Sequence, residues 1–198
     1  LVFCSFNDQL FDNKAINPYT PAAYTWPSTI PQWAQDELKS ELQRLMTLLN
    51  VKTGVYNIET RLCKNGKPYI MEVSPRGGGN RLSEMMKYIS GQDLIDNCVR
   101  AAVGEPIDTI SQPKNNGYWA EVILHSECNG IFQTINIDKS TENKYLVEKD
   151  IWVKEGDKVQ GFTGANTTIG TLVLRFKKER ELIKFIKNIN KWITIQNI

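Results

Sequence analysis

The sequence predicts an α+β chain, in which an antiparallel sheet with flanking helices is followed by a small β-rich lobe with a terminal helix. Three observations support this class. Residues 32–50 place apolar side chains at helical spacing, and residues 56–74 form two strand-like runs around an Asn-Gly turn. From about Asn115, runs rich in β-branched and aromatic residues alternate with turn signals. We expect two domains, 1–113 and 114–198.

Composition is that of an ordinary soluble globular protein, with 41% hydrophobic and 23% charged residues among 198. The net charge of +2, without a Lys/Arg block, gives no reason to expect nucleic acid. The apolar runs are too short to predict a membrane span. The four cysteines (Cys4, Cys63, Cys98 and Cys128) lack paired or metal-binding spacing, which predicts reduced thiols and a cytoplasmic location. The first residues lack Met and a basic segment, so they are expected to be mid-protein sequence.

The first helix is predicted to follow the segment Thr29-Ile30-Pro31-Gln32, which offers a cap residue, a proline for the first turn and a capping-box Gln. Its apolar face comprises Trp33, Leu38, Leu42, Leu45, Met46 and Leu49. We interpret Trp26 and Trp33 as packing residues; stacking on adenine is the alternative.

The other elements follow from the same signals. Phe3 and Phe6 suggest a strand. Helices are expected at about 81–90 and 93–103, and the second should turn inward Leu94, Ile95, Cys98, Val99, Ala102 and Val103. Further strands are expected at 118–124, 131–137, 151–153 and 171–176, with a polar loop at 138–148, a helix at 179–190 and an edge strand at 192–198.

The most informative stretch is the predicted hairpin. Asn-Gly tolerates positive φ at both central turn positions, so Asn65-Gly66 is expected to form a two-residue loop. Glu59 then faces Glu72, and Asn57 faces Ser74, on closely spaced pairs that project from one face. The opposite face is expected to be apolar, with Tyr56, Ile58, Thr60, Leu62, Tyr69, Met71 and Val73.

Two carboxylates placed opposite each other destabilise a sheet unless one is protonated or a cation lies between them. Mg²⁺ is usually held by one or two carboxylates together with substrate phosphates. The hairpin therefore predicts an oxygen-rich cation site. The alternatives are an exposed hairpin with two screened glutamates, or a bulge that breaks this register.

A glycine-rich loop follows the second strand. Gly77, Gly78 and Gly79 let the backbone approach a ligand and offer N–H groups to anions, and Arg76 and Arg81 flank them. A helical run begins directly afterwards, with its N-terminus at the loop. The spacing fits neither a P-loop nor a dinucleotide fingerprint. A flexible hinge is the alternative, but the acidic pair and the two arginines favour an anion-and-metal site.

Together these motifs resemble the C-terminal half of an ATP-grasp domain, over about Pro21 to Pro106. The shared pattern is a strand ending in an acidic residue, a turn, a strand reading Glu-x-Asn-x-Arg, a glycine-rich loop, and a Gly-x-Asp-Leu turn at Gly91-Gln92-Asp93-Leu94. Ser74 departs from the pattern, since most members carry Asn there. The lobe after Asn115 resembles the C-terminal region of carboxylase-like members.

The resemblance implies roles for these residues. Glu59 and Glu72 would bridge Mg²⁺ or Mn²⁺ to ATP phosphates, with Ser74 as a weaker ligand. Arg76 would bind the transferred phosphoryl group or the acyl substrate. The phosphates or carboxylate would be held by Gly77, Gly78, Gly79, Asn80 and Arg81. From its position opposite Ser74, Asn57 is expected to supply the missing amide.

The implied activity is that of a carbamoyl-phosphate synthase-like or carboxylate-amine ligase. ATP would activate a carboxylate as an acyl phosphate, which an amine attacks with release of ADP and phosphate; bicarbonate or thiol variants of this chemistry are open. The expected partners are a small carboxylate, an amine and an upstream part of the same enzyme that carries the ATP lid. The chain alone would then be an incomplete enzyme, and a homodimer is an open alternative.

The sequence also leaves functions other than an ATP-grasp ligase open. In a non-catalytic assembly module with a decayed site, Arg61 or Arg76 would neutralise the glutamates. The second alternative is an enzyme whose glycine loop binds a different phosphorylated ligand without a metal ion. The segment Gly156-Asp157-Lys158-Val159 also resembles biotinyl or lipoyl domains, but the Met-Lys turn that these need is absent. His125, the single histidine, is interpreted as structural and not as an acid–base group.

Overall fold

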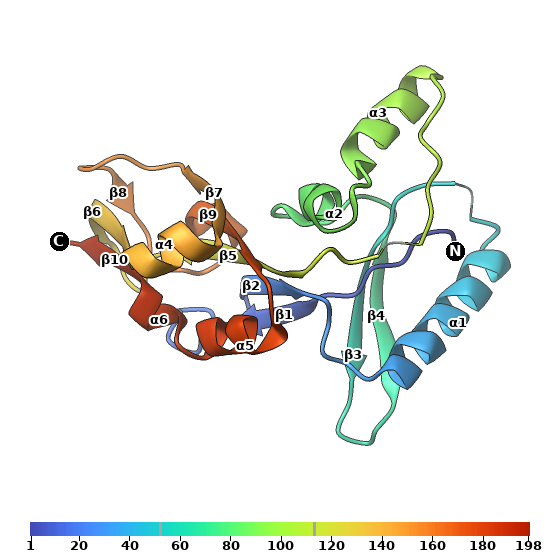
Figure 1. The fold of residues 1–198 in the computed structure, drawn as a ribbon, viewed down its shortest axis with the longest axis horizontal. Helices are drawn as coiled ribbons and strands as arrows, with labels where there is room; N and C mark the ends of the chain where they lie inside the picture. Colours follow the sequence, from blue (N-terminus) through green and yellow to red (C-terminus); the bar gives the residue numbers. More distant parts are fainter. Residues whose placement is uncertain (52, 113) are drawn as a thin grey trace. The chain divides into compact units, whose positions relative to one another are not determined.

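The computed structural model describes residues 1–51, 53–112 and 114–198, and the chain divides into two compact units (Figure 1). Unit 1 comprises residues 1–6 and 28–116, and unit 2 comprises residues 7–27 and 117–198. Antiparallel sheets with flanking helices confirm the predicted fold class. The boundary expected at residue 113 lies outside the described residues, so the division into 1–113 and 114–198 stays a prediction.

Unit 1 is built around a β-hairpin. Its elements are α1 (Gln32–Leu48), β3 (Asn57–Leu62), β4 (Pro68–Ser74), α2 (Leu82–Ser90) and α3 (Leu94–Val103). Helix α1 packs against β4 and buries the stripe Ala34, Leu38, Leu42 and Met46 (Figure 1). The end signals expected for the next two helices are confirmed: Gly91 and Gly104 close them with φ of 79° and 78°.

Two expectations for α1 are wrong. The helix begins after Pro31 without a side-chain cap, because the proline alone sets the first-turn geometry, so the capping box does not form. On the apolar face, Trp33 and Leu49 are 51% and 62% exposed and are not core residues, because the buried stripe runs through Ala34, Leu38, Leu42 and Met46. Trp26 in unit 2 is fully buried, which confirms its assignment to packing.

Helix α3 is oriented differently from the expectation. Ile95, Val99 and Val103 are 47%, 58% and 67% exposed, and Cys98 and Ala102 are exposed as well, so the predicted inward face is wrong for these five residues. The buried residue of α3 is Asn97, whose side-chain amide donates to Asp93 O (2.8 Å) and whose Oδ1 accepts from the backbone N–H of Asp108 (2.7 Å). Local hydrogen bonding by this amide, and not apolar burial, sets the rotation of α3.

Unit 2 contains a five-stranded and a three-stranded antiparallel sheet. The first has the order β1 (Asp8–Phe11), β2 (Pro21–Trp26), β5 (Tyr118–His125), β9 (Thr168–Phe176), β7 (Leu146–Ile151), and the second the order β10 (Ile193–Asn197), β6 (Gly130–Ile137), β8 (Lys158–Val159). Alternate residues of β5 and β9 contribute to the core, among them Val122 on β5 and Leu172, Leu174 and Phe176 on β9. The strand suggested by Phe3 and Phe6 is wrong: strand pairing begins at Asp8, and Phe6 O accepts a single backbone hydrogen bond, from the Ser28 N–H (3.1 Å).

The polar segment expected to be a loop at 138–148 is instead helix α4 (Lys139–Tyr145) followed by the start of β7. Asp138 caps the helix by accepting a hydrogen bond from the Thr141 N–H (2.9 Å), and Tyr145 packs on Phe176 with ring centroids 4.5 Å apart. The cap and the aromatic contact, together with the ion pairs of Lys144 with Glu181 and of Lys149 with Glu142, hold in place a segment whose composition is that of a loop.

The end of the chain follows the prediction more closely. The final helix is divided into α5 (Glu179–Lys187) and α6 (Ile189–Trp192), and β10 is the expected edge strand, paired only with β6.

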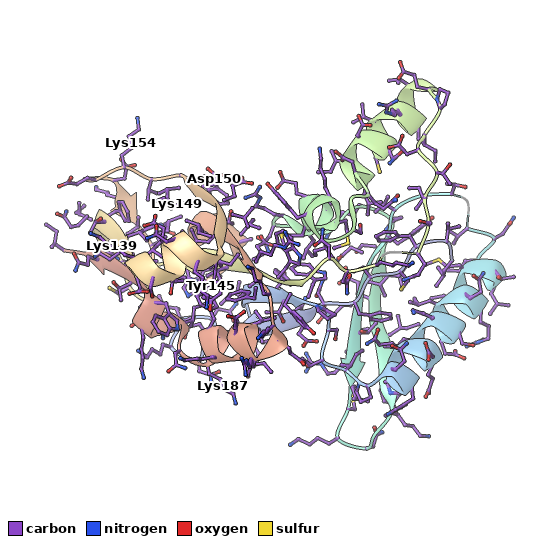
Figure 2. All side chains as sticks on the ribbon, in the orientation of Figure 1. Lys139, Tyr145, Lys149, Asp150, Lys154 and Lys187 are labelled. Atoms are coloured by element: carbon purple, nitrogen blue, oxygen red, sulfur yellow. The ribbon has the colours of Figure 1, made fainter. Side chains whose placement is uncertain are left out.

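Charged side chains of unit 2 are interleaved by sign. Lys144 pairs with Glu181 (2.9 Å) and Lys149 with Glu142 (3.2 Å), while Lys187 projects away from α5 (Figure 2). Within the described ranges, none of the helices combines the length and apolar character needed to cross a bilayer.

Candidate functional site

The hairpin brings the predicted residues into the predicted pairs. Asn57 lies opposite Ser74, and Glu59 lies opposite Glu72. The route to this register differs from the expectation, however. The Gly66 N–H donates to Cys63 O (2.9 Å) and Gly66 has a φ of 76°, so the loop at the tip is one residue longer than the expected Asn-Gly turn.

A β-bulge compensates for the longer loop. Thr60 pairs with Ile70 while Glu59 pairs with Glu72, so Met71 is an extra residue on β4. Met71 is 60% exposed, and the expectation that it lies on a buried apolar face is wrong. Tyr69, also assigned to that face, is 43% exposed. The longer loop shifts the register by one residue, and the bulge restores it before the glutamates.

Among the described residues, no ion pair involves Glu59 or Glu72. Ser74 Oγ donates a hydrogen bond to Glu72 Oε1 (2.5 Å), which fixes that carboxylate from its own strand. Glu59 is half-buried and Glu72 is exposed. In the part of the chain that the structure describes, neither Arg61 nor Arg76 forms an ion pair with these glutamates. The contact expected of a decayed site is therefore missing here.

The glycine loop is seated on the first turn of α2. The Leu82 N–H donates to Gly79 O (3.3 Å), and a Cβ on Gly77 would lie 2.5 Å from Ser83 Oγ. Arg76 folds back along the loop, with Nη1 donating to Gly77 O (2.8 Å). A flexible hinge would not make such contacts, so the hinge interpretation is the weaker one.

The loop also touches the hairpin. A Cβ on Gly78 would lie 2.7 Å from Leu82 Cβ and 3.0 Å from Asn57 Oδ1, whereas a Cβ on Gly79 would meet nothing within 4 Å. Gly78 is thus a position of close approach, where the absence of a side chain lets the loop lie against both β3 and α2. This contact places Asn57 between the acidic pair and the loop.

Arg81 lies at the start of α2 and is mostly buried, with a side chain 10% exposed. Its Nε contacts Glu84 Oε2 at 2.6 Å, an ion pair within the first helical turn. Asn80, the residue before it, has a φ of 52°, which turns the chain from the loop into the helix. Both predicted anion-binding residues therefore lie at the junction of loop and helix.

Oxygen donors gather on the hairpin: the Glu59 and Glu72 carboxylates and the Ser74 hydroxyl. Such a donor set suits hard divalent cations, Mg²⁺ or Mn²⁺. Among the residues that the structure describes, no group of three or more His, Cys, Asp or Glu side chains could hold a metal by itself. A cation on Glu59 and Glu72 would complete its coordination with water or ligand phosphates, as Mg²⁺ commonly does.

His125 lies in unit 2 and makes structural contacts. Its Nδ1 contacts Ile123 O (2.7 Å), its Nε2 contacts Asp12 Oδ2 (3.1 Å), and its ring stacks on Phe162 at a centroid distance of 4.1 Å. Burial would raise the pKa of Asp12, but hydrogen bonds from the Lys14 N–H and from His125 lower it below its usual value. The structural interpretation of His125 agrees with these contacts. Sequence reasoning missed its partner, because nothing in the sequence links two residues so far apart.

No model of a known protein family matches the chain. Over 95 residues it is 33% identical to carnosine synthase 1 from Gallus gallus, which covers 48% of this chain and 10% of that protein. It also resembles a phosphoribosylglycinamide synthetase from Anaerococcus prevotii, with a TM-score of 0.77, 19% identity, and coverage of 97% of this chain and 49% of that one.

Two further solved structures share the architecture. An L-amino acid ligase from Bacillus licheniformis has a TM-score of 0.77 at 16% identity, covering 93% of this chain and 46% of its own. The biotin carboxylase domain of a Hydrogenobacter thermophilus 2-oxoglutarate carboxylase, in complex with MgADP and bicarbonate, has a TM-score of 0.70 at 14% identity, covering 98% and 42%.

These likenesses define a class by its fold. The chain has the fold of the C-terminal part of ATP-grasp ligases, which confirms the predicted resemblance. It spans about half the length of these solved structures and about a tenth of the curated relative.

Proposed function

We propose that this chain supplies the metal- and phosphate-binding half of the active site of an ATP- and Mg²⁺-dependent carboxylate-amine ligase. The observation that carries the proposal is the Glu59–Glu72 pair, which faces across the hairpin on the same strands as Asn57, whose side chain lies against Gly78 of the glycine loop. The fold likeness to an L-amino acid ligase and the partial identity with carnosine synthase 1 support this class.

In this proposal Glu59 and Glu72 hold Mg²⁺ or Mn²⁺, and Ser74 contributes by fixing the Glu72 carboxylate. The donor set fits the ion, and the bound ion would offset the negative charge of the nucleotide phosphates. A serine hydroxyl is a weaker ligand than the amide oxygen usual at this position, so the two carboxylates carry most of the affinity.

The loop is proposed to hold the phosphates of ATP or the acyl phosphate made from them. Backbone N–H groups of Gly77–Gly79 and the N-terminus of α2 offer donors to such oxygens, with Asn80 and Arg81 beside them. Arg76 is the proposed catalytic residue. Its guanidinium can exchange Gly77 O for an oxygen of the transferred phosphoryl group, a better acceptor because it is charged.

The proposed reaction is activation of a carboxylate as an acyl phosphate, followed by attack of an amine; bicarbonate or a thiol substrate would use the same half-site. Positioning and charge neutralisation would supply most of the catalysis. The ATP lid and the substrate-selecting surfaces are proposed to come from an upstream part of the same enzyme. A cytoplasmic location and a homodimer stay predictions.

A Mn²⁺ titration followed by EPR, with and without ATP, tests the proposal. The wild type should bind Mn²⁺ more tightly with ATP, and Glu72→Gln should lose this gain because it removes one anionic ligand. Glu155→Gln, which removes an exposed carboxylate from unit 2, is the matched control and should behave as the wild type. Equal binding by the wild type and Glu72→Gln, or no binding by the wild type, would contradict the metal site.

A further inference from the structure

Asn57 is the point where the hairpin touches the glycine loop. It lies on β3, two positions before Glu59 and opposite Ser74, whose hydroxyl donates to Glu72. The side-chain oxygen Oδ1 of Asn57 lies 3.0 Å from the position that a Cβ on Gly78 would take. The strand that carries Glu59 therefore also carries a side chain that lies against the loop.

The other loop contacts come from α2 and from Arg76. Gly77 lies against Ser83, the Gly79 carbonyl accepts from the Leu82 N–H, and Arg76 donates to the Gly77 carbonyl. These contacts tie the loop to the helix. Among the atoms that a Cβ on Gly77, Gly78 or Gly79 would meet within 4 Å, Asn57 Oδ1 is the one that belongs to β3.

We propose that Asn57 is a positioning residue that couples the acidic pair to the glycine loop. The proposal rests on the proposed function for its chemistry, because it matters only where one nucleotide meets both a cation and the loop. The phosphates of one nucleotide can contact both the cation and the glycine loop only if the distance between the carboxylates and the loop stays fixed. The packed Asn57 side chain fixes that separation before the ligand arrives, which lowers the ordering cost of binding.

The coupling has a structural signature that needs no ligand. In the wild-type chain, ¹⁵N relaxation should give Gly77–Gly79 order parameters like those of α2, about 0.85 for rigid backbone. Asn57→Ala removes the contact and should lower them toward about 0.6. Gly79→Ala, which enters open space, is the control and should leave the amides of Gly77 and Gly78 unchanged. A loop already mobile in the wild type, or equally ordered in Asn57→Ala, overturns the proposal.

The functional signature is the gain in Mn²⁺ affinity on adding ATP. Asn57→Ala should reduce this gain about tenfold, the effect of roughly 1.4 kcal/mol, while Mn²⁺ affinity without ATP stays at the wild-type value. Gly78→Ala should do the same, because its methyl group would push the loop from Asn57 and Leu82. Glu155→Gln, the exposed control in unit 2, should not. If Asn57→Ala weakens Mn²⁺ binding without ATP as strongly as Glu72→Gln does, Asn57 is a metal ligand and the positioning role is wrong.

The two measurements separate this inference from the proposed function. No Mn²⁺ binding by the wild type, together with a loop that loses order in Asn57→Ala, would refute the metal site and leave the positioning contact standing. Intact ATP-enhanced Mn²⁺ binding in Asn57→Ala would refute the coupling and leave the proposed function standing.

Discussion

Replacing Glu72 by Gln should change the stability of the chain in opposite directions with and without ligand. Without ligand, the two facing carboxylates repel each other. Glu72 is exposed, so a water-like dielectric applies, and at roughly 5 Å the repulsion is about 0.8 kcal/mol. Glutamine keeps an Oε1 that can accept the Ser74 hydrogen bond. The variant should therefore melt about 2 °C higher than the wild type.

With Mn²⁺ and ATP at about 100 times their Kd, the wild type should gain about 2.7 kcal/mol, or roughly 5–11 °C in Tm. Glu72→Gln should gain little, so the order of the two melting temperatures reverses. Differential scanning calorimetry of both proteins, with and without Mn²⁺ and ATP, measures the Tm change caused by the substitution and the Tm gain caused by the ligands. Glu155→Gln controls for the loss of a negative charge elsewhere.

Two results would refute this reasoning. A lower Tm for ligand-free Glu72→Gln would mean that the 2.5 Å hydrogen bond from Ser74 stabilises the charged carboxylate by more than Glu59 destabilises it. A Tm gain with Mn²⁺ and ATP that is the same in both proteins would mean that the nucleotide binds without Glu72.

Three further predictions concern unit 2. Phe176→Ala should lower the free energy of unfolding by about 3–5 kcal/mol, seen in chemical denaturation, because it removes a fully buried ring from the core; a loss below 1 kcal/mol would contradict this packing. Gly170→Ala should destabilise by about 1–3 kcal/mol in the same assay, because its Cβ would meet the Asp150 carbonyl oxygen at 2.4 Å, which is backbone and cannot turn away. Because the pKa of Asp12 is lowered in the folded chain, its ionised carboxylate stabilises the fold at pH values above the ordinary carboxyl pKa of about 3.9. This stabilisation is lost as the pH falls through the folded-state pKa. In Asp12→Asn, the free energy of unfolding should therefore depend less on pH in the acid range.

The candidate site was predictable because its signals are local. The facing of Glu59 and Glu72 follows from a short hairpin, and the loop follows β4 directly. Even so, the predicted pairs arise from two deviations that cancel, the longer loop closed by Gly66 and the extra residue Met71. Turn residues indicate that a chain reverses, but the exact loop length depends on hydrogen bonds such as that from Gly66 to Cys63.

The wrong predictions have a common cause: in each case the observed structure depends on a contact that the periodicity of the sequence does not encode. The apolar stripe of α3 predicts burial, yet Asn97 turns the helix by bonding the backbone of Asp108. The segment after Asp138 reads as a polar loop, yet a cap and the Tyr145–Phe176 contact order it as a helix. A pattern specifies which residues can share a face but not which face a tertiary contact selects.

The bulge at Met71 also makes the hairpin a convenient site for protein engineering. It separates the tip, residues 62–68, from the acidic pair, so the length of the tip and the register at Glu59 need not change together. Asn65 and Gly66 at the tip are exposed. A peptide tag or a fluorophore inserted there would leave the register at Glu59 and Glu72 unchanged and would report on the proposed nucleotide binding, without occupying either end of the chain.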